Sequence, residues 1–368
     1  MNDFPRQWKA VGAAVAQAVE RVGQRGWYIL GSEVSGFEQD MARFWGAKHV
    51  VGVANGMDAI EIGLRCLGIT SGDKVLTTPL TAFATTLAIM RIGATPVYVD
   101  VDAAGLLDLA QVRWALREDP SIRAIVPVHL YGFSLDLDEL ERIQSETGVP
   151  VLEDCAQSIG ASFGDRFAGT VGRCAATSFY PTKNLGAIGD GGALVTGEAG
   201  IDSHARQLRN YGQSSQYVHD VAGLNSRLDE LQAAILRDAM LPQLQLWTDR
   251  RRETATRYLS GIRNPSIQLP AHSPQCRPVW HLFPIVIDPA LRDTFRDHLH
   301  RHGIGSGIHY PSMTVEQRAL IGTGKFDVLT ELTQAKRLSR GEVSLPIHPF
   351  LTTAEIDSVI DICNRWQP

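Results

Sequence analysis

The sequence predicts an α/β fold in which helices cover both faces of a mostly parallel sheet. Short apolar runs alternate with helical patterns through the first two thirds of the 368 residues. This alternation is typical of strand–helix–strand units, whose consecutive strands lie parallel. The pattern changes near residue 228, where a long helical segment begins. We therefore expect a large domain at 1–245 and a smaller α+β domain at 246–368.

The expected strands are short and apolar at consecutive positions, as in HVVGVAN and VPVLED. Such runs indicate strands buried on both faces, as the strands of parallel sheets are. Seven segments of this kind form the expected sheet of the large domain, at 49–55, 74–79, 95–100, 123–130, 149–154, 175–180 and 192–197.

The expected helices carry apolar residues at three- and four-residue spacing. They lie at 57–68, 81–93, 135–148, 228–262, 291–303 and 355–366. Pro242 interrupts the longest of these segments, because proline lacks the backbone donor that a helix interior needs. One further strand is expected in the smaller domain, at 280–288.

The composition excludes several functional classes. A net charge of −5 argues against nucleic acid as the main partner, since such proteins favour a basic surface. No segment approaches the roughly 18 apolar residues of a membrane-spanning helix, and the N-terminus lacks a secretory pattern. The five cysteines are scattered and form no CxxC pair, so we expect no metal site and no disulfide framework. A reducing cytoplasm is the expected location.

Lys183 has the most informative surroundings of any residue in the chain. It lies in the segment SFYPTKNLGAIGDGGAL. A lysine amine forms imines when a fold holds it against a carbonyl compound. Ser178, five residues upstream, offers a hydroxyl to a phosphate, and four nearby glycines allow a ligand to approach the backbone. A solvated surface position is the alternative for any single lysine.

Asp154 is the candidate acidic partner. It ends the apolar run VPVLED, and open α/β sheets bind their ligands at the carboxyl ends of strands. A carboxylate there could keep the pyridine nitrogen of pyridoxal phosphate (PLP) protonated. A capping carboxylate at the next turn is the alternative. In the same string, EDCAQSIGA, Gln157 can reach a cofactor and Ala156 can lie flat against its ring.

Three further segments could contact such a ligand, and each has an ordinary structural alternative. The string ANGMDAI follows a strand and opens a helix, so amides near Gly56 and Met57 can face a phosphate. Phe83 could stack on the cofactor ring or simply join the core. Asn225 and Arg227, in GLNSRLDELQAA, could bind phosphate or cap the helix that follows.

Together these strings resemble the sugar aminotransferases of the DegT/DnrJ/EryC1/StrS family. The matching strings run in order along nearly the whole chain, from GWYILGSEVSGFEQDMARFWGAKHVVGVANGMDAI through VHLYG, EDCAQSIGA, SFYPTKNLGAIGDGGA, LRNYG, GLNSRLDELQAAIL, WHLF and HYP to SLPIHP. The resemblance implies a PLP-dependent fold of type I, like that of aspartate aminotransferase, with a mostly parallel seven-stranded sheet and a smaller C-terminal domain. It also implies a homodimer with two shared active sites.

The resemblance assigns cofactor roles to individual residues. Lys183 matches the Schiff-base lysine, Asp154 the aspartate at the pyridine nitrogen, and Gln157 the glutamine near the ring hydroxyl. The other matching positions are Gly56, Met57 and Ser178 around the phosphate, Phe83 against the ring, and Asn225, which in this family reaches the phosphate from the neighbouring subunit. For the substrate, Arg227, His309 and Tyr310 are the expected contacts.

The implied activity is transfer of an amino group from L-glutamate to a nucleotide-linked ketosugar. NG-x-DA at 55–59 looks like members that aminate C3 of dTDP-linked sugars, so a dTDP-3-keto-6-deoxyhexose is the expected substrate. Many members have threonine where this chain has Met57, so here backbone amides must bind more of the phosphate. The alternatives are another keto carbon, a UDP or GDP sugar, an inosose, a PLP dehydratase, or a regulator that binds PLP without catalysis.

Overall fold

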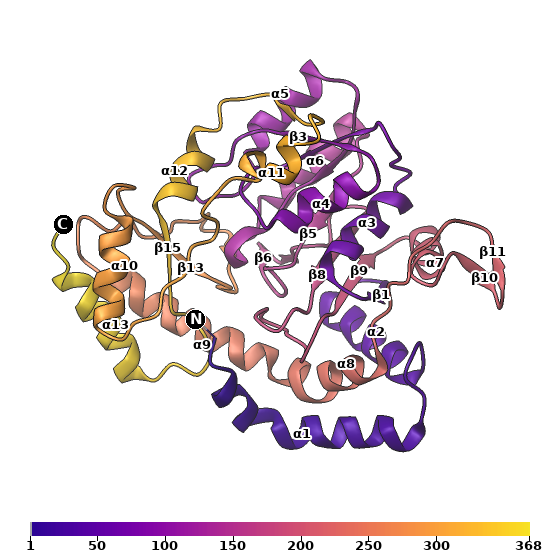
Figure 1. Cartoon of the computed structure of the whole chain (residues 1–368), viewed down its shortest axis with the longest axis horizontal. Helices are drawn as coiled ribbons and strands as arrows, with labels where there is room; N and C mark the ends of the chain where they lie inside the picture. The colour runs from indigo at the N-terminus through magenta and orange to yellow at the C-terminus, as the bar shows by residue number, and fades with distance from the viewer. Residues whose placement is uncertain (1) are drawn as a thin grey trace.

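One twisted sheet runs through the centre of the molecule (Figure 1). The computed structural model describes residues 2–368. In spatial order the strands of this sheet are β14 (Asp327–Val328), β3 (Thr95–Tyr98), β2 (Lys74–Thr77), β4 (Ile122–Val126), β5 (Leu152–Asp154), β8 (Cys174–Ser178), β9 (Gly192–Thr196) and β1 (His49–Val53). Parallel bridges between Ile125 and Val151 and between Val128 and Asp154 join its two halves.

Strand direction brings the ends of three strands to one edge. Within this sheet β9 runs antiparallel to both β8 and β1, and the other neighbours run parallel. The prediction of a mostly parallel sheet is therefore confirmed. Each of the seven expected segments overlaps one strand, and β14 adds an eighth strand that the seven-stranded prediction lacks. Since β1, β5 and β8 share a direction, their carboxyl ends lie at the same edge, where such sheets bind ligands.

Helices cover both faces because neighbouring strand residues point in opposite directions. Val51, Ala176 and Leu194 pack against α3 (Gly56–Cys66), α4 (Phe83–Arg91) and α7 (Ala199–Leu208). Their chain neighbours Val50, Ala175 and Val195 pack on the other face against α1 (Phe4–Arg25), α2 (Ser32–Trp45) and α8 (Glu230–Ile235). Figure 1 shows these two groups of helices on opposite sides of the sheet.

The segment predicted as one interrupted helix at 228–262 contains several pieces. After α8 the backbone widens into a π-helical turn, Leu236–Met240, followed by a 3-10 turn, Leu241–Gln243, and then α9 (Leu244–Gly261). Pro242 lies within the 3-10 turn, as its missing donor predicts.

The last third of the chain forms a second, smaller sheet of two antiparallel strands, β13 (Phe283–Val286) and β15 (Glu342–Leu345). Its helices are α10 (Arg292–Arg301), α11 (Arg318–Ile321), α12 (Thr333–Gly341) and α13 (Thr353–Arg365). One hydrophobic core joins this part to the large sheet. In addition, β14 extends the large sheet, so the domain boundary near residue 245 remains a proposal.

The remaining elements connect these layers. They are α5 (Leu109–Glu118), α6 (Leu137–Thr147), the short strands β6 (Ser162–Phe163), β7 (Arg166–Phe167) and β12 (Cys276–Arg277), two 3-10 turns at Leu130–Gly132 and Thr314–Glu316, and the hairpin β10 (Gln213–Ser215)–β11 (Val218–His219). The hairpin projects from the body of the molecule (Figure 1). Within residues 2–368, no helix combines the length and the hydrophobicity needed to cross a membrane.

Candidate active site

Lys183 lies in the loop between β8 and β9, at the carboxyl edge of the sheet. The loop folds back on itself, with the Lys183 N–H donating to Tyr180 O at 2.8 Å. A Cβ on Gly186 would lie 2.4 Å from Pro181 O, so only glycine permits this close return. Burial lowers the pKa of the Lys183 amine to about 8, against an opposing effect of the Asp154 carboxylate. The amine is therefore more readily available as a neutral nucleophile than a surface lysine.

Asp154 is a buried acid at the end of β5. Its carboxylate accepts from the Thr85 hydroxyl at 2.9 Å and from the Ala156 N–H at 3.1 Å. Burial raises its pKa, while these two bonds and the charge of Lys183 oppose the rise. Among residues 2–368 no basic side chain forms an ion pair with it. A buried carboxylate without a bonded cation fits the place of a protonated pyridine nitrogen.

The start of α3 and the end of β8 form a narrow cradle. A Cβ on Gly56 would approach Ser178 Cβ to 2.8 Å, and one on Gly192 would approach the Asn55 carbonyl carbon to 2.4 Å. Glycine at both positions therefore lets these segments meet. The Asn55 side chain caps the Asp58 N–H at 2.8 Å, whereas the first amides of α3 have no partner within the helix. These amides and the Ser178 hydroxyl suit a phosphate.

Gln157 joins the large sheet to the C-terminal part of the chain. Its Oε1 accepts from the Tyr131 N–H at 2.8 Å, and its Nε2 donates to the Tyr310 hydroxyl at 2.9 Å. Burial, followed by the charge of Asp154, raises the pKa of Tyr310, so the phenol stays protonated. The structure thus brings Asp154, Gln157 and Tyr310 together, as the sequence predicts.

His309 lies near Lys183, whose charge acts on the His309 imidazole. The Tyr131 hydroxyl donates to His309 O at 2.6 Å. Burial and the charge of Lys183 lower the pKa of the His309 imidazole to about 4, so the ring is neutral at physiological pH. His309 lines a cavity of about 100 Å³ together with Thr182 and His281.

Three predicted cofactor residues flank these groups. Phe83 is the first residue of α4, two positions before Thr85, and is half-buried. Ala156 is half-buried beside Asp154, and Met57 is half-buried in the first turn of α3. Their positions are compatible with contact to a ligand at this edge, and their individual roles remain predictions.

Neither Asn225 nor Arg227 forms a hydrogen bond with Lys183 within residues 2–368. The Arg227 guanidinium donates to Asn210 Oδ1 at 3.0 Å and lies 5.0 Å from the centre of the Tyr211 ring. Asn225 is exposed, and its side chain forms no hydrogen bond within residues 2–368. Neither residue caps α8, whose N-cap is Asp229. The roles of both in ligand binding remain predictions.

Two residues that the sequence did not single out support the lysine loop. Asn184 follows Lys183, and its side chain donates to Val279 O at 3.0 Å and pairs with His281 Nδ1 at 3.1 Å. Burial, followed by the charge of Lys183, lowers the pKa of His281 well below its ordinary value. The available signal was a histidine within the apolar string WHLF, two residues before β13.

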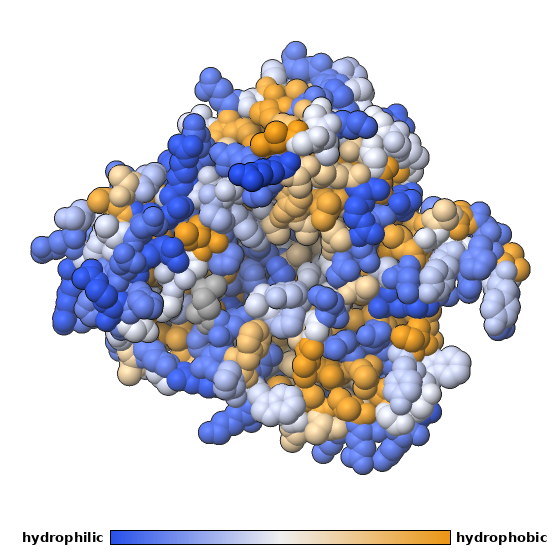
Figure 2. Space-filling model, in the orientation of Figure 1, coloured by the Kyte–Doolittle hydropathy of each residue, from blue (hydrophilic) through white to orange (hydrophobic). Residues whose placement is uncertain are grey.

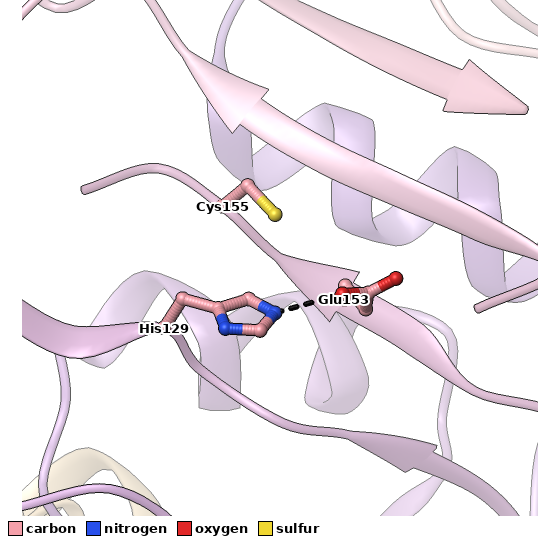
Figure 3. A group of neighbouring side chains, drawn as sticks. All are labelled: His129, Glu153 and Cys155. Carbon is pink, nitrogen blue, oxygen red and sulfur yellow. Dashed lines mark hydrogen bonds and ion pairs between the residues drawn. The ribbon is translucent and has the colours of Figure 1, made fainter. Parts of the chain in front are cut away.

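A buried cluster of His129, Glu153 and Cys155 lies beside Asp154 and resembles a metal-ligand set (Figure 3). Glu153 already accepts from the N–H groups of three loop residues, at 2.8, 2.9 and 2.7 Å, and pairs with His129 Nε2 at 2.8 Å. His129 Nδ1 accepts from the Leu135 N–H at 3.1 Å, so Nε2 carries the hydrogen and donates to Glu153. Burial raises the pKa of the Cys155 thiol. The polar atoms of Glu153 and His129 already have hydrogen-bond partners within the protein, and the Cys155 thiol stays protonated. These three side chains therefore do not fit a metal ion.

Comparison with known proteins gives consistent matches over the whole chain. The profile of the DegT/DnrJ/EryC1/StrS aminotransferase family matches residues 9–364. A Streptomyces venezuelae dTDP-3-amino-3,4,6-trideoxy-alpha-D-glucose transaminase is 41% identical, covering 99% of this chain and 95% of that protein. An Acidithiobacillus ferrooxidans UDP-N-acetyl-3-dehydro-alpha-D-glucosamine 3-aminotransferase is 38% identical, covering 92% and 89%.

A crystal structure of S. venezuelae DesV in complex with a ketimine intermediate is also similar. It is 41% identical, superposes with a TM-score of 0.94, and the match covers 99% of this chain and 97% of that one. The predicted fold class is therefore confirmed.

Proposed function

Because this chain belongs to the DegT/DnrJ/EryC1/StrS aminotransferase family, we propose that it transfers an amino group from L-glutamate to C3 of a dTDP-linked 3-keto-6-deoxyhexose. The protein is a nucleotide-sugar aminotransferase, and its reaction is a step of deoxyamino sugar biosynthesis. The observation that carries the amino-transfer chemistry is the pairing of Lys183, whose amine has a pKa lowered by burial, with a buried acid, Asp154, at one edge of the sheet.

PLP is the cofactor that the residues fit best. Gly56 and Gly192 let the start of α3 approach the end of β8 beside Ser178. Within residues 2–368 Asp154 has no ion-pair partner, and Lys183 has a lowered pKa. When bound, PLP supplies an electron sink that stabilises negative charge on the Cα of the amino donor. Asp154 would keep the ring nitrogen protonated, and the cradle would hold the phosphate.

The chain's own groups would move one proton. In the first half of the reaction Lys183 Nζ would take the proton from the donor Cα and give it to the cofactor. In the second half it would take a proton back from the cofactor and give it to the sugar carbon that receives nitrogen. A base with a pKa near the working pH does this best, and burial brings Lys183 towards that value. Gln157 and Tyr310 would hold the reacting groups in line with the amine and exclude water from one side.

We also propose a homodimer in the cytoplasm. An apolar groove of about 460 Å³ borders the lysine loop, lined by Pro181, Ala187 and Ile188 and by residues of α1 that include Trp8. Trp8 and Ile188 are 56% and 47% exposed in the single chain, and Figure 2 shows apolar residues gathered over this side of the molecule. A second copy would cover them and bring Asn225 of the partner subunit to the phosphate.

Subunit mixing tests the shared site. Lys183→Ala and Asn225→Ala chains are each expected to be inactive, and a mixture should regain part of the activity, because a hybrid dimer contains one intact site. Lack of recovery despite measured subunit exchange would exclude the cross-subunit role of Asn225.

The relatives favour C3 as the aminated carbon but differ in the nucleotide, and the A. ferrooxidans relative makes a UDP sugar the second candidate. The test is the formation of 2-oxoglutarate from L-glutamate with dTDP-, UDP- and GDP-linked ketosugars and with scyllo-inosose. We expect the highest kcat/KM with a dTDP-3-keto-6-deoxyhexose. Turnover only with another acceptor would replace the substrate, and failure of glutamate to convert the bound cofactor at all would favour a regulator.

A further inference from the structure

A chain of buried polar groups lies behind the His309 ring. Glu342 and Ser344 sit two positions apart on β15, so their side chains leave the same face of the strand. Glu342 Oε2 accepts from the backbone N–H of His309 at 2.5 Å, and Glu342 Oε1 accepts from the Ser344 hydroxyl at 2.5 Å. Ser344 Oγ lies 2.9 Å from His309 Nδ1. Both side chains on β15 belong to residues that are fully buried.

The hydrogen-bonded series Glu342–Ser344–His309 allows two self-consistent arrangements of hydrogens. When Glu342 is ionised, Ser344 donates to it, so Ser344 Oγ must accept from Nδ1–H of His309. The other ring nitrogen, Nε2, is then a bare acceptor. When Glu342 is protonated on Oε1, it donates to Ser344, which in turn donates to Nδ1. Nε2 then carries the hydrogen, because a neutral imidazole has one donor and one acceptor.

We propose that Glu342 is a positioning residue that acts through Ser344: it fixes the orientation of the His309 ring, and its protonation selects whether Nε2 is a donor or an acceptor. His309 shares a cavity with Thr182, the neighbour of Lys183, and the charge of Lys183 acts on its ring, so the selected form lies beside the lysine loop. The inference rests on the proposed function for the ligand that His309 meets, whereas the relay itself exists without ligand.

The groups around Glu342 determine the pH range in which its carboxyl group titrates. Burial raises the pKa of Glu342 to about 8, and the charges of Arg292 and Arg296 on α10 oppose the rise. The hydroxyls of Tyr131 and Tyr310 also face Glu342.

Around the ring itself, the charge of Lys183 faces His309, and His281 lies close to it. Since the pKa of His309 is about 4, the ring is neutral while Glu342 titrates. Its tautomer, and not its charge, is therefore what changes.

Nitrogen-15 NMR of full-length, histidine-labelled protein measures this directly, with His309→Asn identifying the signal. Between pH 6.5 and 9.5 we expect the His309 Nε2 resonance to move from the position of an N–H nitrogen towards that of a bare one. In Glu342→Gln the amide donates to Ser344 at every pH, so Nε2 should keep its hydrogen throughout. Glu331→Gln is the charge-matched control and should follow the wild type, because Glu331 is exposed and forms no ion pair within residues 2–368.

Ser344 provides the second variant. Ser344→Ala should abolish the pH step and lower kcat/KM about tenfold, because a tenfold loss is the size expected for one hydrogen bond. Ser344→Thr keeps a hydroxyl and should restore both. A His309 tautomer that stays constant in the wild type, or a pH step that persists in Glu342→Gln or Ser344→Ala, would overturn the relay. Because the NMR measurement needs no substrate, such a result is independent of whether the proposed amino transfer is correct.

Discussion

Glu153 and Asp154 are consecutive buried carboxylates on one strand, yet their surroundings differ in kind. Burial acts to raise the pKa of Glu153, but the bond and charge of His129 and the N–H groups of Gly172 and Gly169 outweigh it, and the pKa lies below its ordinary value. Within residues 2–368 the Asp154 carboxylate accepts two hydrogen bonds, and its pKa is raised. A buried acid with a full set of donors stabilises the fold, and one with an incomplete set is suited to a ligand.

The largest expected effect concerns the amine that faces Asp154. Lys183→Arg keeps the positive charge but removes a base that can lose its proton near neutral pH, so we expect turnover to fall by at least about 10³-fold. The measurement is glutamate-dependent turnover together with the visible absorbance of the protein, which should also change. Lys325→Arg, at an exposed position, is the matched control. Normal turnover of the Lys183 variant would remove this residue from the mechanism.

Asp154→Asn tests the ligand side of the comparison. The amide cannot keep a pyridine nitrogen protonated, so we expect kcat to fall by about 10²-fold or more, with folding retained. Activity and thermal unfolding measured on the same preparation separate the two effects. A variant that is active but poorly folded would make Asp154 a structural residue like its neighbour.

Glu153→Gln tests the structural side of the comparison and should lower the stability of the fold more than the activity. Its amide would place a donor against backbone N–H groups, so we expect a loss of about 2–4 kcal/mol in the free energy of unfolding. The folded fraction should keep most of its activity. Urea unfolding measures the loss, and unchanged stability would contradict the account of the cluster.

Lowering the pH should change the stability contributions of Glu153 and Asp154 in opposite directions. A lowered folded-state pKa means that Glu153 contributes stability above its unfolded pKa, near 4.5, and loses it as the pH falls through the folded value. The raised pKa of Asp154 has the opposite sign: ionised Asp154 costs stability above the unfolded value of 3.8, and the cost vanishes in acid. The penalty of Glu153→Gln should therefore shrink below about pH 4.5, and any gain from Asp154→Asn should disappear below about pH 3.8. Urea unfolding at pH 7 and pH 3.5 measures both.

The smallest expected effect is at the phosphate cradle. Ser178→Ala removes one hydroxyl from a site that also has helix amides, so we expect the Kd for PLP to rise about tenfold, corresponding to about 1.4 kcal/mol. Gly192→Ala should raise the Kd for PLP more than Ser178→Ala does, because its Cβ would collide with the backbone of Asn55. Cofactor titration followed by absorbance compares the two, and unchanged affinity in both would place the phosphate elsewhere.

The sequence predicted the parts of this comparison that are encoded locally. Asp154 ends an apolar run and Lys183 lies in a glycine-rich string, so each has a signal within about ten residues. Contacts between distant segments were not predictable from such signals. Glu342 meets His309 across 33 residues and Asn184 meets His281 across 97, and only the folded chain brings them together.

Some secondary structure was missed for similar reasons. The two residues of β14 form a strand only because β3 offers an edge to pair with. The π-helical turn after α8 has no composition of its own. By contrast, α1 had a visible signal, since Val11, Val15 and Val22 repeat at helical spacing and are buried on one face.

The most direct measurement is borohydride treatment of the protein loaded with PLP, followed by peptide mass mapping. Reduction makes any carbon–nitrogen bond between the cofactor and a lysine permanent. We predict a single pyridoxyl group on the peptide that contains Lys183, and its absence after prior incubation with L-glutamate. A label on a different lysine, or no label on protein that has been supplied with PLP, would contradict the account.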